Sequence, residues 1–311
     1  MIVRSLGRPR LSGWGIAAVL VTGAALLANW RIGGAKVRNA APREGGKLIE
    51  TEIVTANVKV EGAGPTIVMI HGFSAAIGWW DPISDDLATD HQVVRLDLIG
   101  HGGTAAPRAG YAIERQAALV SAVLDNLGVE SAKVIGHSMG GEVATALVEM
   151  RPTLVERLVL IDSPATVDAV FTPVMQAYLT SVIGEAMSRF MTDNDIRRGL
   201  VQGFAPGFPI PERFVADFRQ LTYKAFRLAH EESVAYRTKK PTYERLAAIV
   251  PSPPLLAITG SMDAIVPPAS AMLYARVRGA RVEIVQGSGH SPMIEKPKET
   301  LAFIREFLRA T

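Results

Sequence analysis

Residues Val134–Gly141 read Val-Ile-Gly-His-Ser-Met-Gly-Gly, and this stretch constrains the fold of the chain more than any other. An apolar run, Ala132 to Ile135, leads directly into it, and a helix-forming run, Glu142 to Met150, follows at once. In a Gly-x-Ser-x-Gly sequence at such a junction, the serine occupies a sharp strand-to-helix turn, and the glycines let the backbone approach closely. The sequence therefore predicts strand, tight turn and helix, with Ser138 as a candidate nucleophile.

Runs that suit buried strands alternate with helix-forming runs along most of the chain. We expect such strands over Thr66–Ile70, Gln92–Leu98, Ala132–Ile135, Leu158–Ile161, Pro254–Thr259 and Arg281–Val285. Alternating apolar residues over Leu48–Val60 predict an additional early hairpin. Strands that alternate with helices form a mainly parallel sheet, and ligands bind beyond the carboxyl ends of its strands.

Polar residues that could assist Ser138 follow the later strands. Asp263 lies just past Pro254–Thr259, and His290 lies on a glycine-rich loop after the next strand. We expect His290 to take the proton of Ser138, and the Asp263 carboxylate to orient the imidazole and stabilise its charged form. Asp162, which also follows a strand, is the alternative acid, and Asp263 is the preferred one.

A catalytic serine of this kind also needs backbone donors for the negative charge that develops on the carbonyl oxygen. The strand Thr66–Ile70 stops at His71-Gly72-Phe73-Ser74, upstream of the candidate nucleophile. The backbone amides of Phe73 and Met139, the latter directly after Ser138, are therefore the candidate oxyanion-hole donors.

Five other residues invite a functional interpretation, but a structural one is preferred for each. His71 is expected to fix its loop rather than to act as a base. Asp97 and His101 resemble a catalytic pair, but the glycines around them indicate a sharp turn in which polar side chains bond to backbone. Trp79 and Trp80 stand at the start of a helix and are interpreted as core packing.

Residues 165–246 change character, because they contain no clear buried strand. Their large apolar residues include Phe171, Met175, Tyr178, Met187, Phe190, Met191, Phe204, Phe208, Phe214, Phe218, Tyr223 and Phe226. We expect a helical cap over the carboxyl ends of the strands, with the proline-rich loop Ala205–Pro211 as a lid or hinge. Most of the aromatic residues should form the core of the cap, and some should line an apolar pocket.

The segment Leu11–Trp30 has no charged side chain and is flanked by basic residues. A membrane-spanning helix needs about 20 apolar residues, so this length suffices, and Trp14 and Trp30 suit the two interfaces. We expect an uncleaved single-pass anchor followed by a tether, Ile32–Gly46, with the body on the extracytoplasmic side. A cleaved signal peptide and a secreted body are the alternative.

Composition excludes several classes of site and partner. The chain has no cysteine, so disulfides, thiolate catalysis and cysteine-ligated zinc are excluded. The first 46 residues hold seven basic side chains and one acidic one, whereas the whole chain has a net charge of +3, so the remainder is acidic by three charges. A basic leader on an acidic body favours a membrane surface over nucleic acid as partner. Oligomeric state stays open.

From Leu48 to Thr311 the chain resembles the α/β-hydrolase superfamily. The motifs that carry the resemblance are His71-Gly72-Phe73, Asp97–Gly102, Gly136–Gly141, Gly260–Pro267 and Gly289–Pro292. The resemblance implies a mostly parallel eight-stranded sheet with an inserted helical cap, no metal and no organic cofactor. Together with the apolar N-terminal segment and the change of character after β-strand-forming residues 158–161, it predicts four parts: an anchor and tether (1–46), a first core part (47–163), a cap (164–247) and a second core part (248–311).

Departures from relatives within that superfamily narrow the expected reaction. Haloalkane dehalogenases and epoxide hydrolases use an aspartate where Ser138 stands. Carbon–carbon bond hydrolases typically follow His-Gly with a glycine- and proline-rich loop, whereas this chain has Phe73-Ser74-Ala75-Ala76. We expect a carboxylesterase or lipase-like serine hydrolase acting on an apolar ester or thioester. A carbon–carbon bond hydrolase, a haloperoxidase-like member and a slow-turnover ligand-binding receptor are the alternatives.

Overall fold

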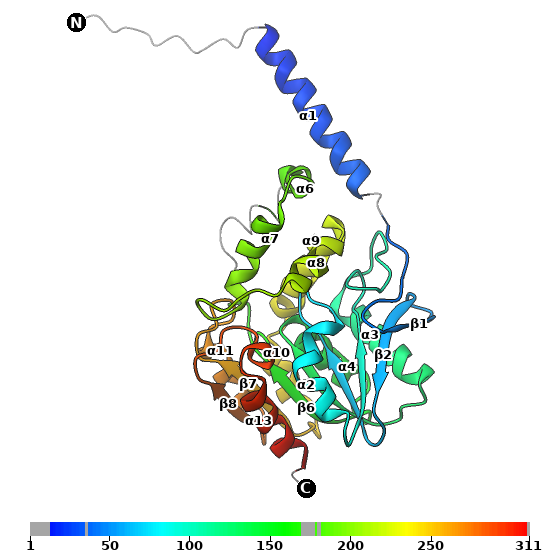
Figure 1. Cartoon of the computed structure of the whole chain (residues 1–311), viewed down its shortest axis with the longest axis vertical. Helices are drawn as coiled ribbons and strands as arrows, with labels where there is room; N and C mark the ends of the chain where they lie inside the picture. Colours follow the sequence, from blue (N-terminus) through cyan, green and yellow to red (C-terminus); the bar gives the residue numbers. More distant parts are fainter. Residues whose placement is uncertain (1–12, 35–36, 169–177, 179–181, 310–311) are drawn as a thin grey trace, which may run out of the picture.

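The computed structural model describes residues 13–34, 37–168, 178 and 182–309. Its centre is one eight-stranded sheet with the strand order β1-β2-β4-β3-β5-β6-β7-β8 (Figure 1). The strands are β1 (Lys47–Ile49), β2 (Ala56–Glu61), β3 (Thr66–Ile70), β4 (Gln92–Leu96), β5 (Ala132–His137), β6 (Val155–Ile161), β7 (Leu255–Gly260) and β8 (Arg281–Val285). β1 and β2 pair antiparallel, as does β2 with β4, and all other pairs are parallel. The predicted early hairpin and mostly parallel eight-stranded sheet are confirmed.

Helices cover both faces of the sheet. Those of the sheet region are α2 (Asp81–Leu87), α3 (Ile113–Asn126), α4 (Met139–Met150), α11 (Pro268–Ala271), α12 (Pro292–Glu295) and α13 (Pro297–Arg309), with 3₁₀ turns η1 (Ile77–Trp80) and η3 (Met272–Arg276). The fully buried Val68 of β3 packs in one apolar cluster with residues of α3 and α4. Its neighbours Ile67 and Met69 pack in a second cluster with residues of α2 and α13. Because successive side chains of a strand point to opposite faces, a strand buried on both faces is a continuous apolar run.

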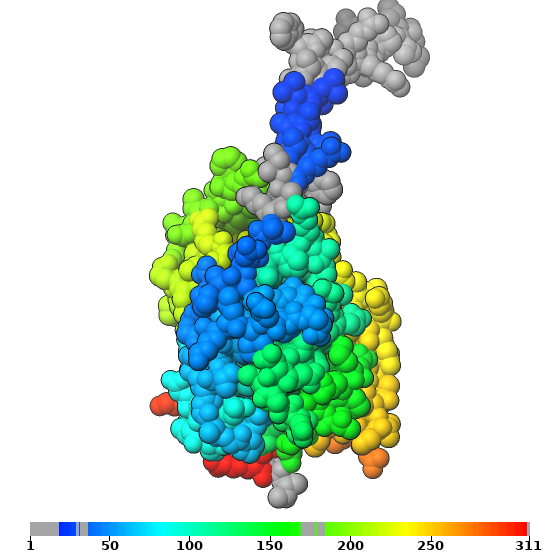
Figure 2. Space-filling view, turned by 90° about the vertical axis from the view of Figure 1, so that its right-hand side faces the viewer, coloured from blue at the N-terminus to red at the C-terminus, as the bar shows by residue number. Residues whose placement is uncertain are grey.

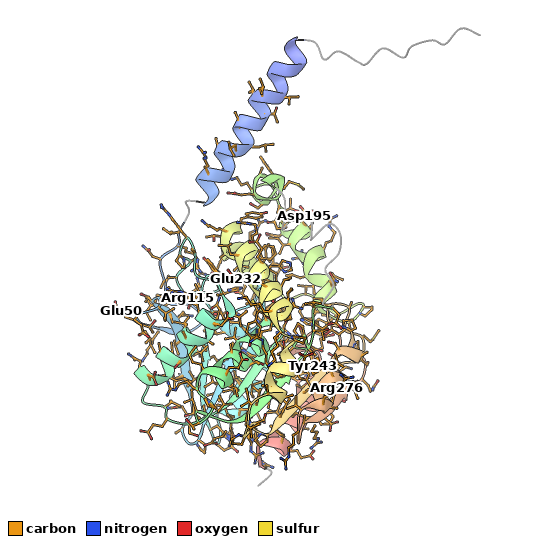
Figure 3. The ribbon with its side chains drawn as sticks, turned by 180° about the vertical axis from the view of Figure 1, so that it is seen from behind. Glu50, Arg115, Asp195, Glu232, Tyr243 and Arg276 are labelled. Carbon is orange, nitrogen blue, oxygen red and sulfur yellow. The ribbon has the colours of Figure 1, made fainter. Side chains whose placement is uncertain are left out.

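The described residues between β6 and β7 form helices and no strand. They are α6 (Val182–Ser188), α7 (Asp193–Leu200), η2 (Val201–Gly203), α8 (Glu212–Gln220), α9 (Tyr223–Lys239) and α10 (Thr242–Ala247). Figure 1 shows α6 to α9 beyond one end of the sheet, and Figure 3 shows this segment from behind, with Asp195, Glu232 and Tyr243 labelled on α7, α9 and α10. α10 packs against α4 of the sheet region. The division of the chain into four parts stays a prediction.

The N-terminal segment forms helix α1 (Gly13–Gly34), which extends away from the body (Figure 2). Among the residues that the structure describes, no helix has the length and apolar character needed to cross a membrane. The predicted membrane span Leu11–Trp30, part of which lies outside the described residues, is therefore not supported. Membrane attachment and an extracytoplasmic body stay predictions.

Candidate active site

Ser138 occupies a strained turn between β5 and α4. Its backbone angles are φ 52° and ψ −122°, a combination that side-chain-bearing residues rarely adopt. The Ser138 amide donates to the Ile161 carbonyl at 2.9 Å, and the Gly141 amide donates to the Ser138 carbonyl at 2.9 Å. These bonds anchor the turn to β6 on one side and to the first turn of α4 on the other. The strained strand-to-helix turn predicted at Ser138 is present.

The glycines of the motif are explained by close backbone approach. A Cβ atom on Gly136 would lie 2.5 Å from the Gly140 carbonyl oxygen, and one on Gly140 would lie 2.2 Å from the Ile70 carbonyl oxygen. Both contacts are shorter than real Cβ atoms tolerate, and both partners are backbone atoms that cannot swing aside. Glycine at these two positions therefore lets α4 start directly against the ends of β5 and β3.

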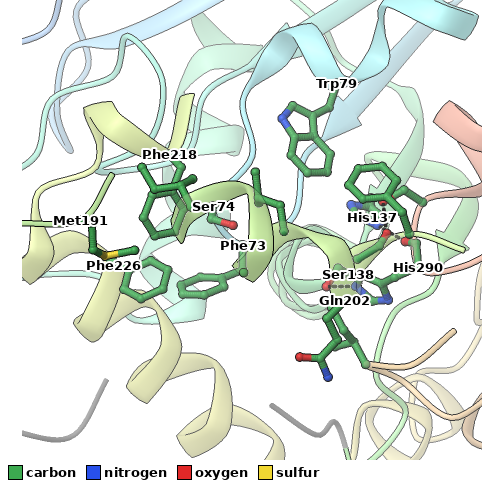
Figure 4. Close-up of a pocket in the computed structure, with 17 residues that line it drawn as sticks. Phe73, Ser74, Trp79, His137, Ser138, Met191, Gln202, Phe218, Phe226 and His290 are labelled. Atoms are coloured by element: carbon green, nitrogen blue, oxygen red, sulfur yellow. Dashed lines mark hydrogen bonds between the residues drawn. The ribbon is translucent and has the colours of Figure 1, made fainter. Parts of the chain in front are cut away.

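The structure brings the three predicted catalytic side chains into one hydrogen-bonded chain. His290 Nε2 lies 2.9 Å from Ser138 Oγ (Figure 4). On its other side, His290 Nδ1 lies 2.7 Å from Asp263 Oδ2. Asp263 lies in the loop after β7 and His290 in the loop after β8, so parallel strands deliver both residues to the same edge as Ser138. Both are buried.

Hydrogen bonds and charge keep Asp263 ionised. Its Oδ1 accepts the backbone amides of Ile265 at 2.8 Å and Val266 at 3.0 Å, while Oδ2 faces the imidazole. Burial by itself would raise the pKa of this carboxyl. The charge and hydrogen bond of His290, together with the two amides, outweigh burial and hold the Asp263 pKa below its ordinary value.

Asp162, the alternative acid, lies nearby but makes no hydrogen bond to His290 among the described contacts. Its Oδ1 accepts the Thr259 hydroxyl at 3.0 Å and the Gly260 amide at 2.9 Å, so it ties β6 to β7. Burial, then the Asp263 charge, raises the Asp162 pKa well above its usual range. One atom each of Asp162, Asp263 and His290 lies within 4.8 Å of the others, a spacing that could hold a metal ion. Of these three residues, Asp263 and His290 are also hydrogen-bonded to each other.

Two residues that the sequence analysis did not select hold the His290 loop. His137 Nε2 donates to the His290 carbonyl at 2.7 Å, and burial lowers the His137 pKa to about 3, so this ring is neutral. Glu295 accepts the amides of Gly289 at 3.0 Å and Ser291 at 3.2 Å. His137 belongs to the motif and could have been noticed there. Glu295 follows no pattern in the sequence, and only the folded loop reveals it.

The candidate oxyanion residues Phe73 and Met139 both lie beside Ser138, lining one small cavity with it. The loop after β3 approaches the nucleophile closely, because a Cβ atom on Gly72 would lie 3.0 Å from Ser138 Cβ. Phe73 directly follows Gly72, and Met139 begins α4. The assignment of their amides as oxyanion donors stays a prediction.

The structural interpretation of the upstream polar residues is confirmed. His71 Nε2 accepts the Leu98 amide at 3.0 Å, and burial lowers the His71 pKa to about 4. Asp97 accepts the amides of Ile77 and Gly103, both at 2.8 Å, and is fully buried. His101 is also fully buried, and its Nδ1 lies 3.1 Å from the Ile99 carbonyl oxygen.

Ser138 opens into an apolar cavity of about 90 Å³. Its walls come from the sheet region and from the helical segment, and include Trp79, Met191, Leu200, Phe204, Phe218 and Phe226. In Figure 4, Met191, Phe218 and Phe226 lie to one side of Ser138 and Trp79 lies to another. The interpretation of Trp79 as core packing is therefore incomplete, because the ring also lines the cavity, whereas Trp80 is fully buried. Phe171 and Met175 lie outside the described residues.

Comparisons with known proteins find related sequences and a shared fold. The chain is 28% identical over 266 residues to an uncharacterized protein of Mycobacterium tuberculosis H37Rv, covering 81% of this chain and 78% of that protein. It is 26% identical to the 2-hydroxymuconate semialdehyde hydrolase of Pseudomonas sp. CF600, covering 86% and 95%. The solved structure of a thermophilic esterase from Thermogutta terrifontis superposes with a TM-score of 0.71 at 21% identity, covering 85% and 98%. Residues 67–303 match the alpha/beta hydrolase family, and the chain therefore belongs to that family.

Proposed function

We propose that this protein is a serine hydrolase that cleaves a carboxylic ester, or a thioester, of an apolar substrate through an acyl-enzyme. The observation that carries this proposal is the unbroken hydrogen-bonded chain from Ser138 through His290 to Asp263 at the wall of an apolar cavity. Such a chain supplies a nucleophile, a base within reach of its proton, and an acid that orients the base.

The acylation step follows from the two hydrogen bonds of His290. Its Nε2 accepts the proton of Ser138 Oγ as Oγ bonds to the ester carbonyl carbon, and Asp263 stabilises the charged imidazole. The carbonyl oxygen becomes an oxyanion, which the amides of Phe73 and Met139 stabilise. His290 then gives the proton to the leaving oxygen, and the bond between that oxygen and the carbonyl carbon breaks.

Deacylation repeats these steps with water. His290 Nε2 takes a proton from a water molecule as its oxygen bonds to the acyl carbon, and returns that proton to Ser138 Oγ when the acid leaves. Asp263 stays ionised in both halves of the cycle, consistent with its lowered pKa.

Carbon–carbon bond hydrolysis is the second candidate, since the chain is similar over almost its whole body to a 2-hydroxymuconate semialdehyde hydrolase. The sequence Phe73-Ser74-Ala75-Ala76 weighs against this candidate, because the loop lacks the expected glycine and proline residues. Turnover of 2-hydroxymuconate semialdehyde, measured beside turnover of an ester, separates the two activities.

Labelling by a fluorophosphonate probe, together with hydrolysis of p-nitrophenyl esters, tests the proposal. We expect the wild-type protein to be labelled and to hydrolyse the esters, and Ser138→Ala to lose both properties while keeping its fold by circular dichroism. A folded wild-type protein that binds an apolar ligand but resists the probe would instead be a slow-turnover receptor. Ester hydrolysis that survives in Ser138→Ala would exclude Ser138 as the nucleophile.

A further inference from the structure

A second, smaller cavity meets the apolar cavity at Ser138. Its volume is about 20 Å³, against about 90 Å³ for the larger one, and Ser138 and Phe73 line both. The two cavities differ in chemistry. Helices α4 and α9 contribute four polar side chains to the small cavity, and these are Glu142, His230, Ser233 and Arg237. A substrate held at Ser138 therefore has an apolar cavity on one side and, on the other, a smaller cavity whose mainly apolar wall carries several polar groups.

The polar side of the small cavity is built around a buried ion pair. Glu142 is fully buried and Arg237 is 4% exposed, and Arg237 Nε lies 2.9 Å from Glu142 Oε1 as an ion pair. The Arg237 Nε–H donates to the Ser233 carbonyl at 3.3 Å. The Ser233 hydroxyl donates to Glu142 Oε1 at 3.0 Å. Arg237 Nη1 donates to the Thr166 carbonyl at 3.1 Å. These bonds hold the carboxylate in place beside the nucleophile.

One oxygen of this carboxylate is left unsatisfied. Both polar partners of Glu142 bond to Oε1, and the buried Oε2 has no hydrogen-bond partner among the described residues. Buried acceptors are nearly always paired, because removing them from water without a partner is costly. Glu142 lines the small cavity, so a small shift of its side chain would bring this oxygen to a ligand hydroxyl, which would supply the missing donor.

The position of His290 indicates which half of the substrate enters the small cavity. His290 lines the large cavity, whereas Met139, a candidate oxyanion donor, lines the small one. The leaving oxygen must reach His290 Nε2 to receive its proton, so the alcohol half belongs in the large cavity. The acyl half then points toward Glu142. A volume of about 20 Å³ accepts roughly one water-sized group, which limits the acyl half to a short one.

We propose that the small cavity is an acyl subsite for a short hydroxyacyl group, whose hydroxyl donates to Glu142 Oε2. The substrate class is then an ester of a small hydroxy acid with an apolar alcohol. This inference rests on the proposed serine hydrolase activity and adds the division of the substrate between the two cavities.

Three hexyl esters test the subsite: the hydroxyacetate, the propanoate, which matches it in size, and the methoxyacetate, which is larger by one methyl group. The first carries the hydroxyl donor, the second replaces it by a methyl group, and the third keeps only an acceptor. We expect kcat/KM for the hydroxyacetate to exceed that for each of the others by about tenfold, as a hydrogen bond to a charged group implies. The assay is run well above pH 7, because burial raises the Glu142 pKa to about 7.

In the variant Glu142→Gln, the ratio of kcat/KM for the hydroxyacetate over that for the propanoate should be close to one, because an amide nitrogen can replace the free acceptor. Glu149→Gln is the matched control, since it lies on the same helix and pairs with Arg245 outside the small cavity, and it should keep the preference. Circular dichroism checks that Glu142→Gln keeps its fold, and its rate of fluorophosphonate labelling is measured beside its ester kinetics.

A pH series on the wild-type protein gives a second test that needs no variant. The ratio of kcat/KM for hydroxyacetate over propanoate should fall as pH is lowered through about 7, since Glu142 then gains a proton. Both esters use the same base, so its titration cancels in the ratio. The other titratable groups near Glu142 change charge far from pH 7. Burial lowers the His230 pKa to about 4 and raises the pKa values of Tyr236 and Tyr274. Arg237 is the cation paired with Glu142.

The possible results separate the subsite from the activity. Hydrolysis of all three esters at equal rates, or a preference that survives in Glu142→Gln, overturns the subsite and leaves the serine hydrolase intact. A preference for 2-hydroxyethyl hexanoate over propyl hexanoate, with none among the hexyl esters, overturns the acyl assignment. A wild-type protein that is neither labelled nor active on any ester contradicts the proposed function itself.

Discussion

Two aspartates lie past the carboxyl ends of the adjacent strands β6 and β7, and their surroundings differ. Asp162 directly follows β6, adopts a positive φ of 44°, and bonds through Oδ1 to Thr259 and Gly260 of β7. Asp263 lies three residues beyond β7, where its loop places two amides on one oxygen and His290 on the other. One carboxyl joins two strands, and the other faces the base.

This difference shows how surroundings can move the pKa values of one residue type in opposite directions within one buried group. Two carboxyls close together in a low-dielectric site cannot both ionise, so their surroundings push their pKa values apart. Asp263 has more partners for its charge, and its pKa is lowered, whereas burial raises that of Asp162. We infer that Asp263 is the catalytic acid and that Asp162 is a structural acid that keeps its proton.

The largest expected effect is that of Asp263→Asn. The substitution favours the wrong imidazole tautomer, so kcat/KM should fall about ten-thousand-fold with little change in KM. Asp162→Asn is the matched control and should lose less than about tenfold, since it makes no hydrogen bond to His290. Ester kinetics of the two purified variants decide whether Asp263 or Asp162 is the catalytic acid. Near-normal turnover by Asp263→Asn, with loss in Asp162→Asn, would move the acid to β6.

The next effect concerns stability and should be seen in Asp162→Ala. Removing this carboxyl leaves the Thr259 hydroxyl and the Gly260 amide without their acceptor, which should cost about 1–3 kcal/mol of unfolding free energy. Urea denaturation followed by circular dichroism measures the change. An unchanged midpoint would show that the strands do not depend on this contact.

A smaller effect should appear in the pH dependence of stability. A carboxyl whose pKa is raised on folding contributes stability that is present below its unfolded pKa of about 3.9 and is lost as pH rises toward its folded pKa. Above about pH 4, the unfolding free energy of wild type should therefore fall by up to about 1.4 kcal/mol per pH unit relative to that of Asp162→Asn. Asp85 is exposed, and Asp85→Asn is the control. Its curve of unfolding free energy against pH should run parallel to that of wild type. If the curve for Asp162→Asn also ran parallel to that of wild type, Asp162 would be ionised in the folded protein.

The smallest expected effect is that of Thr259→Val, which keeps the side-chain shape and removes one of the two donors to Asp162. The unfolding free energy should fall by about 1 kcal/mol, and kcat/KM should stay within about twofold of wild type. A large loss of activity would show that the position of Asp162 is transmitted to the base, which would weaken the separation between the two acids.

Local patterns in the sequence were sufficient for the fold and for much of the candidate site. The apolar runs predict strands because both faces of a parallel sheet are covered, as the two clusters around β3 confirm. The strained turn at Ser138 follows from the spacing of its glycines, which meet backbone within the same short stretch. His290 and Asp263 could be proposed because the order of strands places their loops at one edge.

Contacts between distant segments could not be derived in this way. The sequence left two acids open, because both follow strands and only the path of each loop directs the side chain. It assigned Trp79 and Trp80 alike to the core, yet Trp79 also lines the cavity.

The pairing of Glu142 with Arg237, 95 positions apart, depends on how α9 lies against α4. By itself the sequence determined the elements and the class of chemistry, since periodicity and turn geometry act over a few residues. Only the tertiary structure decided which acid faces the base and which polar groups flank Ser138, because packing of whole helices and strands sets those distances.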